Sequence, residues 1–322
     1  MSTIAPVIDF SKCSLNKNED EINDEMRMVT GKNLYEGFTS SGFVYLKNHG
    51  ITQERIDGVY KAAANFFALP LEEKKKSYVG KNSFGYDPVG ALKVNSKKDF
   101  DFVEGFRVTG DAFDDEETKW PNLTLKKKYE ELAESCKFLV LRILRSLGLA
   151  MRVKDLDSFC NCHSLMNKKG NLTQLGVTSY PPVYEDIVSA NRFRLAPHVD
   201  WGTMILLFQD NIGGLQMKQS NGEFADVTPI PGTIILNVGE TLQKFTGGRL
   251  TARVHRVVPP TDPNKQRLTR QTTVYFGHSN KDFPFKSFEF DDDLNNKDFL
   301  TEYEGMTTGE FMNMRLTKAL HY

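Results

Sequence analysis

His198 and Asp200, which are two positions apart in the chain, carry side chains that suit a metal ion. Successive side chains of a β-strand point to alternate faces, so residues i and i+2 of an extended segment can converge on one point. A neutral imidazole and a carboxylate supply two of the three ligands in the facial 2-His-1-carboxylate arrangement, which suits non-haem Fe(II). His255, within the apolar-flanked segment 252–258, is available as the third ligand. We therefore expect His198, Asp200 and His255 to form a metal site.

Other groups that could bind a metal or a ligand lack suitable partners in the sequence. The Cys-Asn-Cys-His segment at 160–163 has no matching pair downstream, so structural thiols are the better interpretation. His49 lies at a predicted strand end without an acidic neighbour, and we expect it to form a structural hydrogen bond. Arg192 and Arg194, just before the metal pair, could reach an acidic substrate or be ordinary surface charges.

The composition is typical of an ordinary globular protein, and we expect this protein in the cytoplasm. The 322 residues include 39% hydrophobic and 26% charged residues, and the net charge of -1 gives no reason to expect a nucleic acid or an anionic membrane as partner. The first residues lack the basic and apolar regions of a secretory signal, and no apolar run approaches the roughly 20 residues that span a bilayer. Four cysteines do not make a disulfide scaffold in so long a chain.

Hydrophobic patterning predicts helices first and short strands later. Helical spacing covers about 24–40, the segment after Thr52, 124–147, 156–165 and 307–322, and short strands are expected at 6–10 and 42–50. Segment 81–110 is less regular, and its parts at 85–88 and 104–107 indicate loops or short strands. From about residue 176 short β-runs follow each other, separated by Gly and Pro turns. These runs are 177–180, 204–208, 215–219, 224–227, 233–238, 252–258 and 272–276. Many short strands without intervening helices favour a sandwich or jelly roll over a parallel α/β sheet.

The motifs, in their order along the chain, resemble those of the iron(II)- and 2-oxoglutarate-dependent dioxygenases, in the branch that includes isopenicillin N synthase. The resemblance covers nearly the whole chain. The matching segments are Pro-Val-Ile-Asp-Phe at 6–10, Gly-Phe-Val-Tyr-Leu-Lys-Asn-His-Gly at 42–50, Phe-Phe-Ala-Leu-Pro at 66–70, Tyr-Pro-Pro at 180–182, the His198/Asp200 pair, Leu-Leu-Phe-Gln-Asp at 206–210, Gly-Gly-Leu-Gln at 213–216, Pro-Gly-Thr at 231–233, Asn-Val-Gly at 237–239 and His-Arg-Val at 255–257.

The resemblance implies a mainly β fold with flanking helices, of the α+β class, around a double-stranded β-helix, or jelly roll. It also implies Fe(II) as cofactor and 2-oxoglutarate and O2 as cosubstrates, with release of succinate and CO2. We divide this single integrated unit into an N-terminal region at 1–110, a helical support at 111–175, the oxygenase core at 176–290 and a C-terminal lid helix region at 291–322.

In this family an Arg-x-Ser/Thr motif on a late strand grips the distal carboxylate of the cosubstrate. Two segments of the chain fit the motif, one beginning at Arg267 and one at Arg270. Arg270 with Thr272 is preferred, because this segment continues directly into the aromatic strand, but the longer spacing from His255 keeps Arg267 open. Tyr180 resembles the tyrosine that adds a second hydroxyl, although the Thr-Ser before it differs from the more usual Asn-Tyr.

Substrate contacts are inferred from the segments that border the site in this family. The candidates are Phe84, Tyr86, Phe106, Met166, Phe276, His278, Phe311, Met314 and Arg315. Their character indicates a small molecule with an apolar portion rather than a protein or a nucleic acid, and we expect a monomer. Substrate hydroxylation, desaturation and oxidative ring closure all stay open.

Two other functions are compatible with these residues. The family includes iron oxidases that do not use 2-oxoglutarate yet retain the Arg-x-Ser type of anchor, and succinate release would separate the two kinds of enzyme. A non-catalytic small-molecule receptor is the second alternative, and the three intact metal ligands argue against it.

Overall fold

In the computed structural model, two β-sheets form the centre of the chain, which is described at residues 4–77, 84–90, 102–113, 120–183, 193–292 and 302–320. Within these residues the larger sheet has eight strands in the order β1-β2-β10-β7-β12-β5-β4-β3, and the smaller has four in the order β6-β11-β8-β9. The strands are β1 (Val7–Asp9), β2 (Phe43–Lys47), β3 (Gly85–Asp87), β4 (Glu104–Thr109), β5 (Gln174–Tyr180), β6 (Leu195–His198), β7 (Met204–Gln209), β8 (Leu215–Lys218), β9 (Phe224–Asp226), β10 (Thr233–Val238), β11 (His255–Val257) and β12 (Arg270–Gly277).

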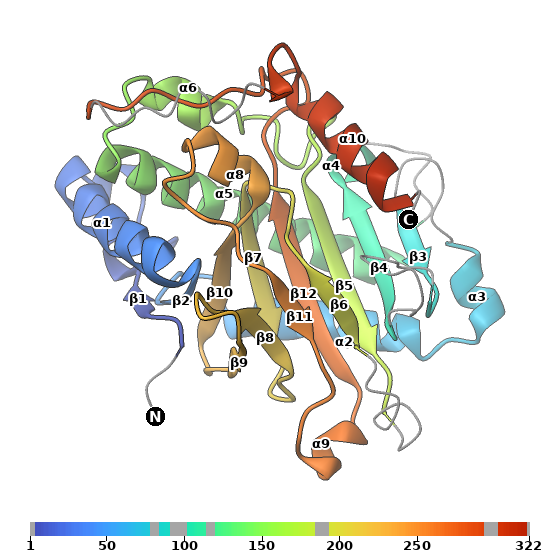
Figure 1. The fold of residues 1–322 in the computed structure, drawn as a ribbon. Coiled ribbons are helices and arrows are strands. Elements are labelled where there is room, and N and C mark those ends of the chain that lie inside the picture. Colours follow the sequence, from blue (N-terminus) through green and yellow to red (C-terminus); the bar gives the residue numbers. More distant parts are fainter. Residues whose placement is uncertain are drawn as a thin grey trace.

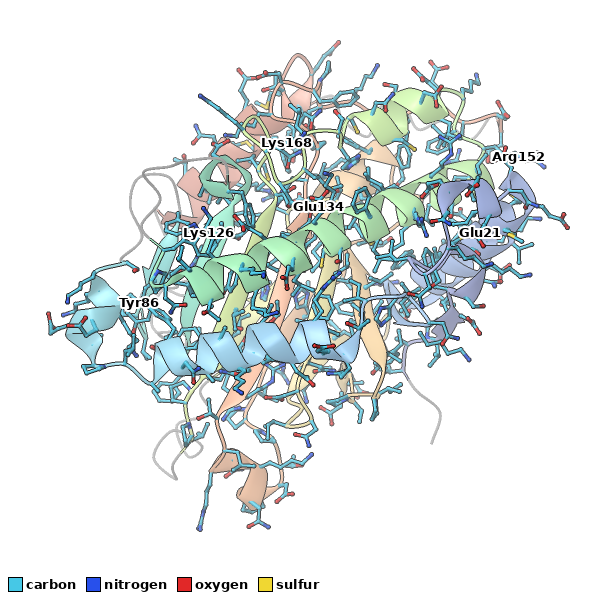
Figure 2. The ribbon with its side chains drawn as sticks, turned by 180° about the vertical axis from the view of Figure 1, so that it is seen from behind. Glu21, Tyr86, Lys126, Glu134, Arg152 and Lys168 are labelled. Carbon is cyan, nitrogen blue, oxygen red and sulfur yellow. The ribbon has the colours of Figure 1, made fainter. Side chains whose placement is uncertain are left out.

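Helices cover one face of the larger sheet, while the smaller sheet lies on its other side (Figure 1). Seen from behind, α5 and α2 run side by side across the strands (Figure 2). The helices are α1 (Asp24–Ser41), α2 (Gln53–Phe67), α3 (Leu71–Lys75), α4 (Gly110–Phe113), α5 (Leu123–Ala150), α6 (Leu156–Asn161), α8 (Glu240–Phe245), α9 (Pro263–Gln266) and α10 (Thr308–Leu320). The main apolar core therefore lies between these helices and the sheet, and the second, smaller core lies on the side of the small sheet.

The helix α5 illustrates how local sequence produces these layers. The Asn122 side chain accepts a hydrogen bond from the backbone N–H of Leu125 at 2.8 Å and so caps the first turn. Leucine, isoleucine and valine residues then recur at helical spacing and are fully buried, among them Leu132, Leu139 and Ile143. Burying each such side chain contributes about 1.5–3 kcal/mol, so α5 is held by its apolar face.

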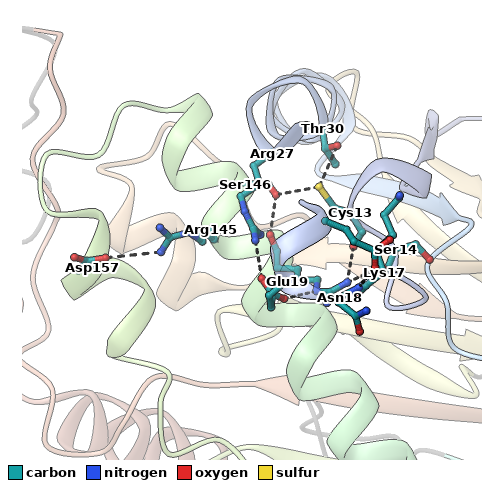
Figure 3. Close-up of polar contacts among 12 residues, drawn as sticks. Cys13, Ser14, Lys17, Asn18, Glu19, Arg27, Thr30, Arg145, Ser146 and Asp157 are labelled. Atoms are coloured by element: carbon teal, nitrogen blue, oxygen red, sulfur yellow. Dashed lines mark hydrogen bonds and ion pairs between the residues drawn. The ribbon is translucent and has the colours of Figure 1, made fainter. Parts of the chain in front are cut away.

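Ion pairs join the N-terminal segment to the helical layer. The exposed carboxylate of Glu19 accepts hydrogen bonds from Arg27 of α1 at 2.6 Å and from Arg142 of α5 at 2.7 Å. Arg142 also donates to the backbone carbonyls of Ser14 and Lys17. Figure 3 shows Glu19 beside Arg27 and this N-terminal turn. One buried guanidinium thus satisfies several carbonyls of a segment that has no strand or long helix of its own.

The mainly β chain with flanking helices is confirmed, and the differences lie at element boundaries and in short elements. The expected strand at 233–238 and the start of α1 agree with the structure, whereas α5 continues to Ala150. The sequence pattern does not predict the short elements β6 and α8, and it leaves β4 between a loop and a short strand. These elements take their conformation from tertiary pairing rather than from a local pattern. The division into four regions stays a prediction.

His49 leads to a prediction about pH. The imidazole is buried, and its Nδ1 accepts a hydrogen bond from the backbone N–H of Ile51 at 3.1 Å, so the expected structural role is confirmed. Burial lowers the pKa of His49 to about 4, although a hydrogen bond to the Gly232 backbone opposes the shift. The unfolded chain takes up this proton near pH ~6.5. Stability should therefore fall as the pH falls from about 6.5 to about 4, by about 2 kcal/mol at pH 5 for this residue.

Urea unfolding at pH 7.5 and pH 5 checks this expectation. The His49→Gln variant keeps a hydrogen-bonding side chain but cannot titrate. It should lose about 2 kcal/mol less stability between the two pH values than the parent protein does. Burial also lowers the pKa of His163 to about 4. This residue contributes the same pH dependence of stability to both proteins, so its effect cancels when the two are compared. An identical pH dependence of the two proteins would contradict the assignment.

Candidate active site

Strand pairing brings two of the candidate ligands together. Strand β6 ends at His198 and pairs antiparallel with β11, in which His255 stands directly opposite His198. The two imidazole ring centroids are 4.3 Å apart. Asp200 lies beyond the end of β6, so strand alternation does not explain its position, contrary to our argument from the i, i+2 spacing. Instead the backbone carbonyl of Asp200 accepts a hydrogen bond from the Glu240 N–H at 2.8 Å, and its carboxylate lies beside both imidazoles.

The three side chains are close enough to share one ion. His198 Nε2 is 3.7 Å from Asp200 Oδ1, and His255 Nε2 is 3.4 Å from Asp200 Oδ2. Each residue offers one ligand atom, and these atoms all lie within 4.8 Å of one another. Ligands about 2.1 Å from a first-row metal and at right angles to each other lie about 3 Å apart, so a small inward movement suffices. Among the described residues, segment 160–163 included, no other three such side chains meet this condition.

Backbone carbonyls orient the two imidazoles. His198 Nδ1 lies 2.8 Å from the carbonyl of Ala196, and His255 Nδ1 lies 3.1 Å from that of Arg253. A carbonyl only accepts, so each Nδ1 carries the proton and each Nε2 presents its lone pair. Burial, with the neighbouring His255, lowers the pKa of His198 to about 4 and keeps it neutral.

Asn237 of β10 is a member of the site that the sequence analysis missed. Its Nδ2 donates to Asp200 Oδ2 at 2.7 Å, and its side chain is buried. The amide holds the carboxylate in one orientation and stabilises its charge. A polar amide in the otherwise apolar run 234–238 was the signal available in the sequence.

A mostly apolar cavity lies between the two sheets and contains the triad. Its polar lining comprises His198, Asp200, His255, Asn237, Tyr180, Arg270 and Thr272, and its apolar lining comprises Phe43, Leu195, Ile205, Leu207, Leu215, Val257, Val274 and Phe276. Alternation along β12 turns every second residue from Arg270 to Phe276 into this cavity. The triad therefore faces a mostly apolar wall.

Arg270 offers an unused cationic donor at the cavity. It is 1% exposed, its Nε donates to the carbonyl of Gly213 at 2.8 Å, and its Nη1 has no hydrogen-bond partner among the described residues. Its guanidinium carbon lies 4.7 Å from the ring of Tyr180, which is its register partner on β5. Arg267, the alternative anchor, is exposed. A buried guanidinium with a free N–H suits a carboxylate ligand.

A threonine pair accompanies this arginine. Thr272 Oγ1 lies 2.5 Å from Thr178 Oγ1, and the two threonines are register partners on β12 and β5. Thr178 belongs to the Thr-Ser that departs from the more usual residues before the tyrosine. It thus supplies a hydroxyl close to the one that we expect to face the cosubstrate.

Arg194 is buried, so an ordinary surface charge is the wrong interpretation of this residue. Arg192 lies outside the described residues. Burial and the nearby Arg270 lower the pKa of Arg194 to about 10, which leaves it charged at neutral pH.

Four of the expected substrate contacts lie in the helix-side core instead of the cavity. Phe84 and Phe106 pack with Trp120, and Tyr86 packs against Phe66 while its hydroxyl donates to Glu104. Met166 is fully buried, and its sulfur accepts from the Tyr275 hydroxyl at 3.9 Å. Strand alternation explains the outcome for Tyr86 and Phe106, which face the helices from β3 and β4. Phe276 does line the cavity.

The C-terminal candidates also lie outside the cavity lining. Phe311 is buried and stacks on Phe285 with ring centroids 4.1 Å apart, and Met314 packs against the same core. Arg315 forms an ion pair with Glu240, the first residue of α8. His278 is buried beside Gly202. The helix α10 is thus anchored by packing and by an ion pair rather than by contacts in the cavity.

Comparison with known proteins identifies the family. Residues 5–127 match the model of the N-terminal region of non-haem dioxygenases in morphine synthesis, and residues 160–278 match that of the 2OG-Fe(II) oxygenase superfamily. The 2-oxoglutarate-dependent dioxygenase ecdK of Aspergillus rugulosus is 31% identical over 281 residues, which cover 78% of this chain and 82% of that protein. The chain belongs to the 2OG-Fe(II) oxygenase superfamily.

Solved structures of this superfamily share the fold. A full-length Neurospora crassa enzyme in complex with alpha-KG and thymine aligns with a TM-score of 0.80 at 28% identity, over 98% of this chain and 96% of that one. The 1-aminocyclopropane-1-carboxylate oxidase of Dictyostelium discoideum is 28% identical over 295 residues, 78% of this chain and 76% of that protein. The 2OG-Fe(II) oxygenase described here accordingly has a double-stranded β-helix core. It is an oxidoreductase that uses Fe(II), 2-oxoglutarate and O2.

Proposed function

We propose that His198, Asp200 and His255 hold Fe(II), and that Arg270 with Thr272 and Tyr180 holds the distal carboxylate of 2-oxoglutarate. The supporting observation is one cavity with a three-ligand cluster and, in the same lining, a buried guanidinium whose Nη1 has no partner among the described residues. An anionic cosubstrate with oxygen atoms at both ends can bind the metal through one end and accept hydrogen bonds from the guanidinium at the other. The guanidinium and the threonine hydroxyls orient the cosubstrate, and the two imidazoles and the carboxylate give the metal its ligands.

Fe(II), when bound with 2-oxoglutarate and O2, supplies the oxidant that cleaves a substrate C–H bond, and the cosubstrate leaves as succinate and CO2. The work of the chain's own residues is positioning and water exclusion. Asn237 holds the carboxylate of Asp200 by its 2.7 Å hydrogen bond, and the apolar wall with Val274 and Phe276 keeps water from the reacting centre. No side-chain nucleophile is needed.

The substrate that suits this wall is a small metabolite with an apolar portion. Relatives include a proline hydroxylase, buaE, of Petromyces alliaceus, and the solved Neurospora crassa complexes contain thymine or 5-formyluracil. We propose a small molecule of specialised metabolism, and hydroxylation, desaturation and ring closure all stay open as outcomes.

We also propose a cytoplasmic monomer that does not act on nucleic acid. The net charge of -1 supports this proposal, because a protein that binds nucleic acid carries an excess of basic residues. No helix in the described part of the chain has the length and apolar character needed to cross a membrane.

Succinate release tests the proposed function. Protein loaded anaerobically with Fe(II) and 2-oxoglutarate is exposed to air, and succinate is measured beside an identical sample without iron. We expect iron-dependent succinate, faster when a substrate is present. Iron-dependent oxygen uptake on a candidate substrate without succinate would favour the 2-oxoglutarate-independent oxidase instead.

A further inference from the structure

Arg194 is a second buried arginine beside the proposed cosubstrate anchor. It directly precedes β6, and its backbone N–H donates to the carbonyl of Val257 at 2.9 Å. Its side chain is 0% exposed. Nη2 donates to the carbonyl of Pro181 at 3.2 Å, whereas Nε and Nη1 have no hydrogen-bond partner among the described residues. Pro181 follows Tyr180, the residue paired with Arg270, and the charge of Arg270 acts on Arg194, so the two guanidinium groups are neighbours.

The charges that the described residues place around Arg194 and Arg270 do not balance. Within the described residues neither Arg194 nor Arg270 forms an ion pair with a carboxylate. Asp210 is the acidic group whose charge acts on Arg194, and its two oxygens accept hydrogen bonds from the backbone N–H groups of Ile212 and Gln271. Among the described residues, the two guanidinium charges therefore have only the more distant carboxylate of Asp210 to offset them.

Such an arrangement is unfavourable without a further anion. A buried ion without a partner loses its hydration, and two like charges at close range repel each other. Three N–H-bearing atoms, Arg194 Nε and Nη1 and Arg270 Nη1, lack acceptors within the described part of the chain. One additional carboxylate would bring the local charge to zero. The cosubstrate of this superfamily carries a carboxylate at the end remote from the metal.

We propose that Arg194 is a positioning residue for that remote carboxylate, acting together with Arg270 to make the site selective for a dianionic 2-oxoacid. This inference rests on the proposed function. Arg270 lines the cavity and contacts the ligand directly, whereas Arg194 lies outside the lining, next to Pro181, and acts through its charge. The expected consequence is a contribution to affinity that depends on the second carboxylate of the ligand and not on its 2-oxoacid end.

A ligand pair separates this role from packing. The dissociation constants of 2-oxoglutarate and of 2-oxopentanoate, which lacks the second carboxylate, are measured by calorimetry on Mn(II)-loaded protein without turnover. In the parent protein 2-oxoglutarate should bind far more tightly. In Arg194→Met the ratio of the two constants should shrink by at least about tenfold, because one of two nearby charges is gone. The affinity for 2-oxopentanoate should change little.

Two further variants keep the test decisive if Arg194→Met folds poorly. Arg194→Gln retains a donor for the Pro181 carbonyl but no charge, and should also lose the preference. Arg194→Lys keeps the charge, and should retain most of the preference for 2-oxoglutarate over 2-oxopentanoate. Equal weakening for both ligands in the uncharged variants would overturn the inference and leave the proposed function standing. Failure of the parent protein to prefer 2-oxoglutarate would overturn both.

Discussion

Replacing His198 with alanine is expected to remove Fe(II) binding and iron-dependent succinate formation together. The imidazole supplies one of three ligand atoms that lie within 4.8 Å of one another, and no other described side chain completes such a group. Structural metal sites bind with about 10–16 kcal/mol, so one ligand accounts for about 3 kcal/mol or more, and iron affinity should fall by at least about a hundredfold. Titration of Fe(II) under anaerobic conditions measures this directly.

A matched variant distinguishes a ligand from a residue that orients one. Asn237→Ala removes the 2.7 Å hydrogen bond to Asp200 and leaves all three proposed ligands in place. Partners of this kind typically change metal affinity or activity by about 10–100-fold, so Asn237→Ala should retain measurable iron-dependent turnover at high Fe(II). Full iron affinity in His198→Ala would show that the triad is not the iron site.

Replacing Arg270 with leucine should raise the KM for 2-oxoglutarate by roughly 10²–10³-fold, because a buried charge-assisted pair that loses one partner costs about 2–5 kcal/mol. Arg270 is 1% exposed, with its Nη1 unpaired among the described residues of the cavity lining. Iron binding should be nearly unchanged, because the proposed metal ligands come from β6, the segment after it and β11. Steady-state succinate formation as a function of 2-oxoglutarate concentration gives the measurement.

Arg267→Leu provides the comparison, since the sequence alone left these two arginines open as the anchor. Arg267 is exposed and does not line the cavity, so its variant should keep the parent KM. The reverse pattern, with a raised KM in Arg267→Leu and a normal one in Arg270→Leu, would exchange their roles. Combining Arg270→Leu with Arg194→Met should give less than the sum of the two effects, because both act on one carboxylate.

The proposed metal ligands can be found in the sequence because their chemistry is rare and their neighbours are apolar. An imidazole or a carboxylate between hydrophobic strands is costly unless it has a partner, so His198, Asp200 and His255 stand out. The long helices are predictable for a similar reason, since the apolar positions of α5 repeat over many turns. The metal ligands are recognised by their contrast with apolar neighbours, and the helix by a repeat within its own segment.

The aromatic candidates show where such reasoning stops. Tyr86 and Phe106 have the character of substrate contacts, but strand register and alternation turn them toward the helices. Asn237 and Arg194 carry no local sign of their partners, because these partners lie on other strands or beyond the ends of those strands.

Residue chemistry and local pattern thus suffice for the candidate metal ligands and the main helices, and the family resemblance of the ordered motifs adds the class of enzyme. The direction in which each side chain of β3, β4, β6 and β10 points follows only from long-range strand pairing, which a short segment does not specify. The surroundings of a charged side chain likewise follow only from the tertiary structure. Arg194 becomes a buried cation near Arg270 only when the segment before β6 contacts Pro181, at the end of β5, and β5 pairs with β12. Burial then leaves two N–H-bearing atoms of this arginine without acceptors among the described residues, and an anionic ligand can neutralise its charge.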